Sequence, residues 1–324
     1  MHQESKFIYN KLITLPDNRV AFSVNYGGEP RTFLPEQVVA TMLQKIKDIT
    51  RKNEVGHSDF VLTVPSYFTE QERRALLDAA KIAEVNVVRL LNEHSAISLA
   101  YGIFRKAELD SNPRNVLFVD IGHSSTSVFL ASFTKDKVAI IDQLHERHLG
   151  SRDIDWILLD FYANIFKKEN GMNPLQNDKA RLRLLEAIEK QRKVLSANSE
   201  ASVNLEYLLE DCDLNHTLSR EKYEQMIAPI VNKLKETLSK INSNMFSLKI
   251  LFKLLCIVSK YSVHSVEIVG GATRIPIIQK TIKEVYGRDL LKTLNTTECI
   301  ARGAAIQVLK VLSILVSKKA SCMQ

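Results

Sequence analysis

The sequence predicts an α/β fold, in which strands and helices alternate and the sheets are covered by helices. Strand-like runs rich in Val, Leu, Ile and Phe alternate with segments whose apolar residues recur at helical spacing. Two of the strands, near residues 120 and 270, run into turns that contain glycine. A chain of 324 residues can bury a large core, and this length favours two compact units over one.

The first hundred residues are predicted to alternate strand and helix. A strand pair begins at Arg19 and turns at Gly27 and Gly28, and further strands are expected at 60–65 and 86–91. Helices are expected at 35–47, 69–81 and 93–104. Thr69 and Glu72, three residues apart, form a capping box that marks the start of the second helix.

The middle of the chain is predicted to begin with an antiparallel meander. A hairpin over 116–132 and a strand over 138–144 form it, and Gly150 with Ser151 then breaks the chain before a helix at 153–166. A second long helix contains 186–196, and 203–208 reads as a strand. Ser219 can cap a helix in which Pro229 predicts a kink or a break.

The last part contains the second glycine turn. A buried strand from Val266 runs into Gly270 and Gly271, and a helix follows Pro276 and ends at Gly287. Thr296 or Thr297 is expected to cap the last helix.

The two glycine turns are candidate phosphate sites, because backbone N–H groups of a tight turn and the start of a helix both attract anions. The first turn consists of Gly122, His123, Ser124 and Ser125. Asp120, at the end of the preceding strand, is placed to hold Mg²⁺ through water, since this cation prefers carboxylate and water oxygens. An ordinary buried hairpin, with Asp120 in the chemistry of its turn, explains the same residues, so both readings stay open.

Two further groups have a functional and a structural reading. Glu93 can orient a water molecule or a metal, but acidic residues also favour helix starts for electrostatic reasons. The four residues Glu189, Arg192, Lys193 and Ser196 share one helical face. That face can grip a nucleoside, and an exposed salt-bridged surface explains the same spacing.

Charge, cysteine spacing and hydropathy indicate which partners and which cellular location the protein has. The formal charge of +7 is spread among acidic residues, so the sequence predicts no nucleic-acid partner. The four cysteines lack metal-type spacing and the first residues carry no signal sequence, so we expect the cytoplasm, with the nucleus as a further location. The most apolar runs, 245–258 and 304–316, are short and interrupted by lysine, which predicts no membrane span.

Seven separated runs carry a family resemblance. They are 62–73, 89–93 with 100–102, the hairpin 116–132, 148–150, 189–196, 269–276 and 303–305. In this order they resemble the nucleotide-binding domain of the heat-shock 70-kilodalton (Hsp70) superfamily. The run Asp-Ile-Gly-His-Ser-Ser at 120–125 is similar to its large, 110-kilodalton (Hsp110) branch. The resemblance implies an actin-like, ribonuclease-H-type fold with two lobes around ATP or ADP and Mg²⁺.

The resemblance also implies roles for single residues. Glu189, Arg192, Lys193 and Ser196 match adenosine-binding positions, as do Gly270, Gly271, Ala272 and Arg274 in the second turn. Asp120, Gly122, His123, Ser124 and Ser125 match the second phosphate loop. Glu93 matches the acidic residue near the hydrolytic water, and Pro65 with Arg73 matches the switch that links ATP to the rest of the machine.

Three departures from the family qualify this expectation. No run in 1–34 resembles the first phosphate hairpin or the catalytic lysine that follows it, the run 243–262 is foreign to the family, and the tail 308–324 is atypical. We therefore expect an incomplete first lobe over 1–112, with apolar surface left uncovered, and a second lobe over 113–307 that includes the return to the first. The foreign run 243–262 is either a basic amphipathic helix that binds a membrane or a partner, or a poorly ordered insertion or translated non-coding segment.

The function expected from the resemblance is that of an Hsp110-type ATP-binding chaperone. Such a protein acts as nucleotide-exchange factor for Hsp70 and holds unfolded protein, and this chain is expected to be a truncated form with weak ATP binding and defective hydrolysis. One alternative is a nucleotide-independent interaction module that binds Hsp70. Another is an active ATPase, or a sugar kinase, of the same fold.

Overall fold

The computed structural model describes residues 7–8, 10–53, 59–253 and 263–309, without the side chains of 241–253. The chain forms two compact units. Unit 1 consists of residues 1–99 together with 300–324, and unit 2 consists of residues 100–299. The chain therefore leaves unit 1, builds all of unit 2, and returns.

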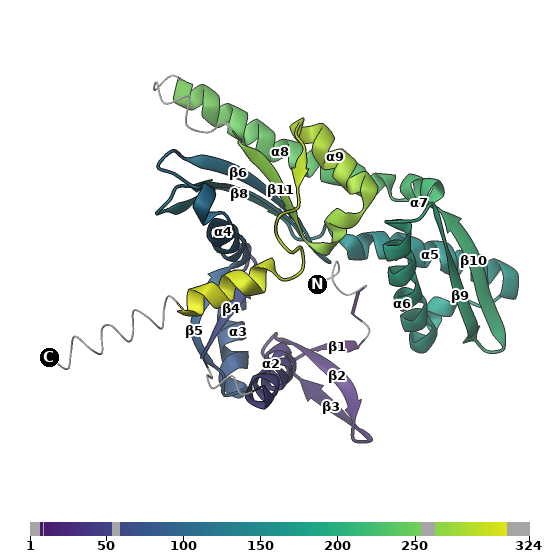
Figure 1. Cartoon of the computed structure of the whole chain (residues 1–324). Coiled ribbons are helices and arrows are strands. Elements are labelled where there is room, and N and C mark those ends of the chain that lie inside the picture. Colours follow the sequence, from purple (N-terminus) through teal and green to yellow (C-terminus); the bar gives the residue numbers. More distant parts are fainter. Residues whose placement is uncertain (1–6, 9, 54–58, 254–262, 310–324) are drawn as a thin grey trace. The chain divides into compact units, whose positions relative to one another are not determined.

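Unit 1 contains two small sheets and their helices (Figure 1). Strands β1 (Lys11–Thr14), β2 (Val20–Tyr26) and β3 (Glu29–Phe33) form an antiparallel sheet, which α2 (Pro35–Lys52) follows. Strands β4 (Asp59–Val64) and β5 (Asn86–Asn92) form a parallel pair connected through α3 (Glu70–Ile82). Helix α4 (Glu93–Phe104) begins in unit 1 and ends in unit 2.

Local signals set the ends of the unit 1 helices. The predicted capping box is confirmed: Glu72 N donates to Thr69 Oγ1 at 3.3 Å, and Thr69 N donates to Glu72 Oε2 at 2.7 Å. The returning helical residues 299–309 pack closely on α4, because a Cβ at Gly303 would clash with the carbonyl of Ala96. Only glycine allows this approach of the two backbones.

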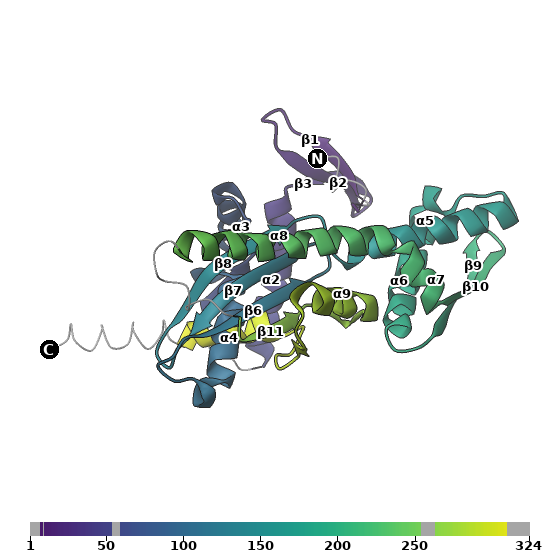
Figure 2. The ribbon, with the colours of Figure 1, turned by 90° about the horizontal axis from the view of Figure 1, so that it is seen from above.

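Unit 2 is built on a five-stranded sheet in the order β12-β11-β6-β7-β8. Figure 2 labels β6, β7, β8 and β11 of this sheet. Its strands are β6 (Arg114–Ile121), β7 (Thr126–Phe133), β8 (Val138–Glu146), β11 (Ser265–Val269) and β12 (Leu290–Leu291). The first three form the predicted antiparallel meander, whereas β11 runs parallel to both β6 and β12.

Helices and a second hairpin complete unit 2. The helices are α5 (Ser151–Asn170), α6 (Asp178–Leu195), α7 (Arg220–Met226), α8 (Ala228–Lys253) and α9 (Pro276–Tyr286), with short 3₁₀ turns η1 (Lys106–Glu108), η2 (Pro174–Gln176) and η3 (Gly271–Arg274). The hairpin is β9 (Glu200–Leu209) with β10 (Cys212–Ser219). One sheet face joins these helices in a continuous core, and the other carries a cluster of Tyr101, Phe118, Phe129 and Phe133.

The predicted elements are confirmed, with three strands missed and one cap wrong. Strands β1, β10 and β12 were not predicted. The predicted break at Pro229 separates α7 from α8, and Gly287 ends α9 as predicted, with a φ of 60°. Neither Thr296 nor Thr297 caps the last helix. The Asn295 side chain instead accepts hydrogen bonds from the amides of Thr297 (3.0 Å) and Glu298 (3.2 Å), because its carbonyl group reaches the following turn.

Some expectations fall on residues outside the described part. Helix α8 reaches Lys253, but the rest of the foreign run 243–262 and the tail residues 310–324 are not described, and neither is the side-chain pattern of 241–253. In the part of the chain that the structure describes, no helix combines the length and the apolar composition needed to cross a membrane.

Candidate functional site

The two glycine turns of unit 2 meet at one edge of the sheet. Strands β6 and β11 are parallel neighbours in which Val269 pairs with Asp120, so both turns leave the carboxyl ends of adjacent strands. Gly270 has a φ of 84°, and a Cβ there would collide with the carbonyl of Ile121 and lie 2.5 Å from Asp120 Oδ1. Glycine is required here both for the backbone conformation and for the close approach.

The second turn is held by the loop that precedes the last helix. The amide of Gly270 donates to the Thr296 carbonyl at 3.1 Å, and the Gly270 carbonyl accepts from the Thr273 hydroxyl at 2.7 Å. Arg274 Nη2 donates to Thr296 Oγ1 at 2.8 Å. Gly271, buried Ala272 and exposed Arg274 all belong to η3, and Gly270 immediately precedes it. The residues of the second turn that are predicted to bind adenosine are therefore consecutive or nearly so in the chain.

The first turn is tied to the start of α5. The Gly122 amide donates to the Ser125 carbonyl at 3.0 Å and closes the turn. The amides of Ser151 and Arg152 donate to the carbonyls of Gly122 (3.1 Å) and His123 (2.9 Å). The four turn residues, of which only the second is exposed, are Gly122, His123, Ser124 and Ser125. The start of α5 therefore fixes the turn.

The predicted face of α6 divides into a buried half and an exposed half. Arg192 makes a two-pronged ion pair with Asp155 of α5, with Nε–Oδ1 at 2.6 Å and Nη2–Oδ2 at 3.2 Å, and both side chains are only 8% exposed. The Lys193–Glu189 pair, with Nζ–Oε1 at 2.7 Å, is exposed. The hydroxyl of Ser196 donates to the Arg192 carbonyl at 3.1 Å. Arg192 thus joins α5 to α6, in the geometry that makes such pairs strong.

The two carboxylates at this helix face, Asp155 and Glu189, have shifted pKa values. Burial raises the pKa of Asp155, against the hydrogen bonds and charge of Arg192 and the charge of His123. The hydrogen bond from Lys193 lowers the pKa of Glu189, and the charges of Arg192 and His123 act in the same direction. The first turn is hydrogen-bonded to the start of α5, and Asp155 of α5 pairs with Arg192, so α5 connects the first turn to the α6 face. Both turns and α6 therefore contribute to one region of unit 2.

The remaining predicted residues form a separate connected group in unit 1. Arg73 Nη2 donates to Asn92 Oδ1 at 2.9 Å, and Arg73 Nε donates to the Phe68 carbonyl at 3.1 Å. The Phe68 amide in turn donates to the Pro65 carbonyl at 3.1 Å. Asn92 immediately precedes Glu93, whose pKa is raised by burial. The predicted switch pair, Pro65 and Arg73, is thereby joined to the residue next to the predicted catalytic acid.

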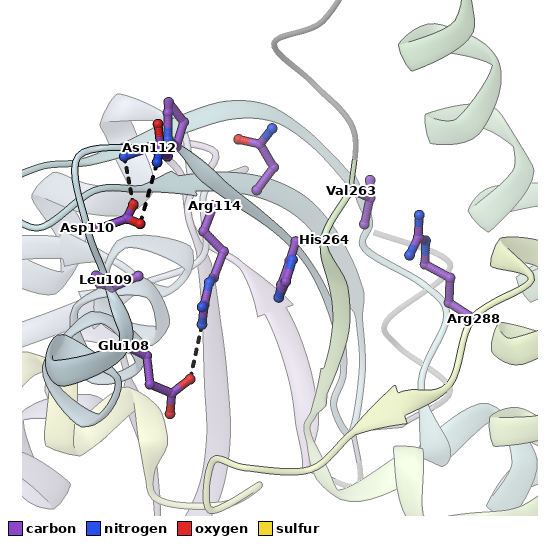
Figure 3. Close-up of a pocket in the computed structure, with 10 residues that line it drawn as sticks. Glu108, Leu109, Asp110, Asn112, Arg114, Val263, His264 and Arg288 are labelled. Carbon is purple, nitrogen blue, oxygen red and sulfur yellow. Dashed lines mark hydrogen bonds and ion pairs between the residues drawn. The ribbon is translucent and has the colours of Figure 1, made fainter.

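Unit 2 contains a hollow beside the glycine turns and another at the opposite ends of the same strands. A cavity of about 420 Å³ opens beside the second turn, and its lining includes Arg274, Thr296 and Lys292. Another, of about 380 Å³, lies at the amino ends of β6 and β11, beside Arg114 and His264 (Figure 3). The second hollow is at the other end of these strands from the glycine turns and contains no predicted site residue.

Sequence reasoning missed two acidic residues of this region. Asp155 gave no signal, because an acidic residue in the first turns of a helix has many explanations. Glu267 did give one, as the single charged residue in a buried strand, Ser-Val-Glu-Ile-Val. Its exposed fraction is 0%. A lone charge at such a position calls for an explanation by its partners.

Glycine turns at the carboxyl ends of adjacent parallel strands are typical of α/β proteins that bind nucleotides. The family model described as "Hsp70 protein" matches residues 1–318. The chain therefore belongs to the Hsp70 family and has the actin-like ATPase fold of that family.

Individual relatives agree with this assignment. The chain is 37% identical over 307 residues to "Heat shock protein 110" of Caenorhabditis elegans, a match that covers 93% of this chain and 38% of the relative. It is 38% identical over 293 residues to "Heat shock 70 kDa protein 14" of Arabidopsis thaliana (90% and 34%) and 36% identical over 311 residues to "97 kDa heat shock protein" of Strongylocentrotus purpuratus (95% and 34%). The predicted family, with its Hsp110 branch, is confirmed. The chain spans 34 to 38% of the length of these relatives.

Proposed function

We propose that unit 2 binds ATP or ADP with Mg²⁺, in a chaperone of the Hsp110 type. The observation that carries this proposal is the approach of Gly270 to Asp120, which brings the two glycine turns to one edge of the sheet. Ligands of open α/β sheets bind outside the carboxyl ends of the strands, which is where both turns lie.

The residues of the region suit the parts of a nucleotide. The turn Gly122–Ser125 offers amides and hydroxyls to the phosphates, and Gly270–Arg274 with the α6 face would hold the adenosine. Asp120 offers one carboxylate at this edge. Mg²⁺ is commonly bound through one or two carboxylates together with water and substrate phosphate oxygens, so Asp120 would hold it in this way. When bound, Mg²⁺ would neutralise phosphate charge.

Hydrolysis would need more phosphate contacts than the residues of unit 2 supply. Phosphoryl transfer depends on positioning and charge neutralisation from several sides. No run in 1–34 supplies the first phosphate hairpin, although Glu93 is present to orient water. In unit 2, the turn Gly122–Ser125 would hold a phosphate.

Calorimetric titration with ADP and Mg²⁺ tests the proposal. Arg274→Ala should weaken binding about tenfold, since an exposed arginine at the second turn would contact the ligand. Lys283→Ala is the matched control, because Lys283 is an exposed cation of α9 paired with Asp289 at 2.6 Å. Equal affinities in the Arg274 and Lys283 variants, or no binding by the unaltered chain, would refute the proposed site.

The cellular role proposed here follows the Hsp110 relatives. The protein would act in the cytoplasm, and in the nucleus, as nucleotide-exchange factor for Hsp70 and as a holder of unfolded clients. Pro65 and Arg73 would couple nucleotide state to this work, and their link through Phe68 to Asn92 supports that role. The test is whether the protein accelerates release of labelled ADP from Hsp70 and whether Arg73→Ala reduces that rate.

A second candidate function is a nucleotide-independent module that binds Hsp70. It is favoured by an apolar stripe on α2, formed by Val38, Met42, Ile46 and Ile49, which are 39 to 58% exposed. Apolar stripes of this kind mark interaction surfaces. Binding to Hsp70 that is unchanged by ADP but lost in Met42→Lys would favour this candidate.

An active ATPase, the remaining alternative, would require measurable phosphate release that Glu93→Gln abolishes.

A further inference from the structure

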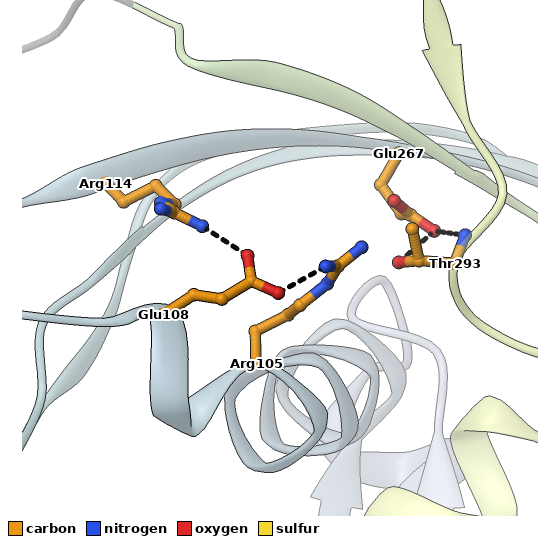
Figure 4. A network of polar contacts seen from close by, with 5 residues as sticks. All are labelled: Arg105, Glu108, Arg114, Glu267 and Thr293. Atoms are coloured by element: carbon orange, nitrogen blue, oxygen red, sulfur yellow. Dashed lines mark hydrogen bonds and ion pairs between the residues drawn. The ribbon is translucent and has the colours of Figure 1, made fainter.

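Glu267 is a buried carboxylate in a central strand of unit 2. It lies in β11 between β6 and β12, and its exposed fraction is 0%. Its Oε1 accepts hydrogen bonds from Thr293 N at 2.5 Å and Thr293 Oγ1 at 3.0 Å (Figure 4). It accepts a third from Leu294 N at 3.0 Å. One carboxylate oxygen therefore holds two consecutive residues of the loop that follows β12.

A buried carboxylate at a central sheet position commonly stabilises the fold no more than an apolar residue would. Burying an ionisable group costs free energy unless it is well paired, and an apolar residue of similar size commonly gives equal or greater stability. Glu267 Oε2 is buried, and no described atom forms a hydrogen bond with it. Burial raises the pKa of Glu267, against the hydrogen bonds from Leu294 and Thr293 and the charge of Arg105. Packing alone therefore does not explain the residue.

Charged neighbours of Glu267 are already paired with one another. Glu108 accepts from Arg105 and, at 3.0 Å, from Arg114, as Figure 4 shows. Arg105 acts on Glu267 through its charge, whereas the hydrogen bonds that Glu267 accepts within the described residues all come from the loop. The directed contacts of this carboxylate thus point to the loop.

The same loop holds the second glycine turn. Thr296, two residues after Leu294, accepts the Gly270 amide at 3.1 Å through its carbonyl and Arg274 at 2.8 Å through its hydroxyl. Between them, Asn295 accepts from the amide of Thr297 at 3.0 Å. The short segment 293–296 is therefore hydrogen-bonded to Glu267 at its first two residues and to the glycine turn at Thr296, and its backbone connects the two.

We propose that Glu267 is a positioning residue that clamps the loop 293–296 onto β11 and thereby keeps the second glycine turn in its ligand-binding geometry. This inference rests on the proposed nucleotide site of unit 2. Groups that support a binding site in this way keep its contacting residues within a fraction of an ångström of the productive geometry. Glu267 itself touches no ligand.

Two substitutions at this position separate clamping from packing. Glu267→Gln keeps an oxygen acceptor and should retain the affinity for ADP and Mg²⁺ within about threefold, whereas Glu267→Leu removes the acceptor and should weaken it about tenfold or more. Hydrogen exchange at the amides of Gly270, Thr293 and Leu294 should accelerate in Glu267→Leu and stay near the original rates in Glu267→Gln.

A core variant controls for loss of stability. Leu214→Ala truncates a fully buried side chain of β10, away from the loop, and should lower the melting temperature without changing ADP affinity or the exchange of the Gly270 amide. Unchanged exchange of the three amides in Glu267→Leu would overturn the inference. So would an equal loss of affinity in Leu214→Ala at a matched melting temperature.

The exchange measurement also distinguishes this inference from the proposed function. If the unaltered chain binds no ADP, the proposed function fails, but faster exchange at Gly270 in Glu267→Leu still supports the clamp. If ADP binds tightly and both Glu267 variants match the unaltered chain in affinity and exchange, only the clamp fails.

Discussion

Units 1 and 2 show the same alternation of strands and helices but differ in what they bury. In unit 2 the sheet is covered by large side chains, among them Tyr162, Phe166, Phe118 and Phe129. In unit 1, the core cluster between α2 and α3 consists of Ala40, Leu43, Ala79, Ala80, Ala83 and Val85. Since buried apolar area is the main source of stability, unit 2 should be the stable scaffold and unit 1 the weaker part.

The largest effect is expected from the buried ion pair of unit 2. Asp155→Ala leaves the Arg192 guanidinium buried without its partner, which should destabilise unit 2 by about 3 to 5 kcal/mol. Trp156, the single tryptophan of the chain, lies on α5 against the core of this unit, so its fluorescence in a urea titration reports on unit 2. Glu189→Ala is the control, because its pair with Lys193 is exposed and should contribute at most about 0.5 kcal/mol. Equal effects of the two variants would contradict the assignment of Arg192 to the core.

A smaller effect, confined to unit 1, is expected from its own core. Leu43 is 3% exposed, and Leu43→Ala should cost about 2 to 3 kcal/mol, since truncation of a buried leucine removes contacts and leaves a cavity. Hydrogen exchange should accelerate in α2 and α3, while the urea midpoint of Trp156 fluorescence stays unchanged. A shifted Trp156 midpoint would show that the two units unfold as one and would remove the contrast between them.

Glu93 allows a comparison by pH within unit 1. Burial raises its folded-state pKa above the unfolded value, so its favourable contribution is complete below about pH 4 and decreases as pH rises through the folded pKa. Glu93→Gln does not titrate at this position. The stability of the unaltered protein relative to Glu93→Gln, measured by urea unfolding at several pH values, should therefore fall as the pH rises above about 4. A relative stability that rises with pH would be inconsistent with a carboxyl group buried at this place.

The smallest change in stability is expected on the apolar stripe of α2. Met42 is 58% exposed, so Met42→Lys should change the free energy of unfolding by no more than about 0.5 kcal/mol. Binding of a dye specific for apolar surface should decrease in the same variant. Lys45→Met, on the same helix, should increase it. Dye binding that does not respond to either substitution would mean that the stripe is not accessible in solution.

Much of the fold could be predicted because strong local signals set its elements. The capping box at Thr69, the glycine at 287 and the break at Pro229 each act within a few residues, and all three predictions are confirmed. Strand β1 has only four residues, and in β10 the alternation of apolar residues is interrupted by His216. Strand β12 has only two residues and is a strand because β11 lies beside it, which is information that no local pattern contains.

The candidate site was less accessible to sequence reasoning. The approach of the two turns depends on the parallel pairing of β6 with β11, whose residues are separated by more than a hundred positions. The helix face at 189–196 was correctly placed on one helix, but its division into an exposed pair and a buried pair depends on Asp155 from another helix. The pattern could not indicate which charges would be buried, because burial is decided by tertiary packing.

The way the chain enters and leaves unit 2 has a consequence for its synthesis. Helix α4 packs against residues near Gly303, yet the whole of unit 2 is translated between these two segments. At translation rates of about 5 to 20 residues per second, the gap of roughly 200 residues corresponds to tens of seconds. Unit 2 can fold on the ribosome during that interval, whereas the first hundred residues must wait for their last helix. The nascent unit 1 is thus most in need of protection before the segment around Gly303 emerges.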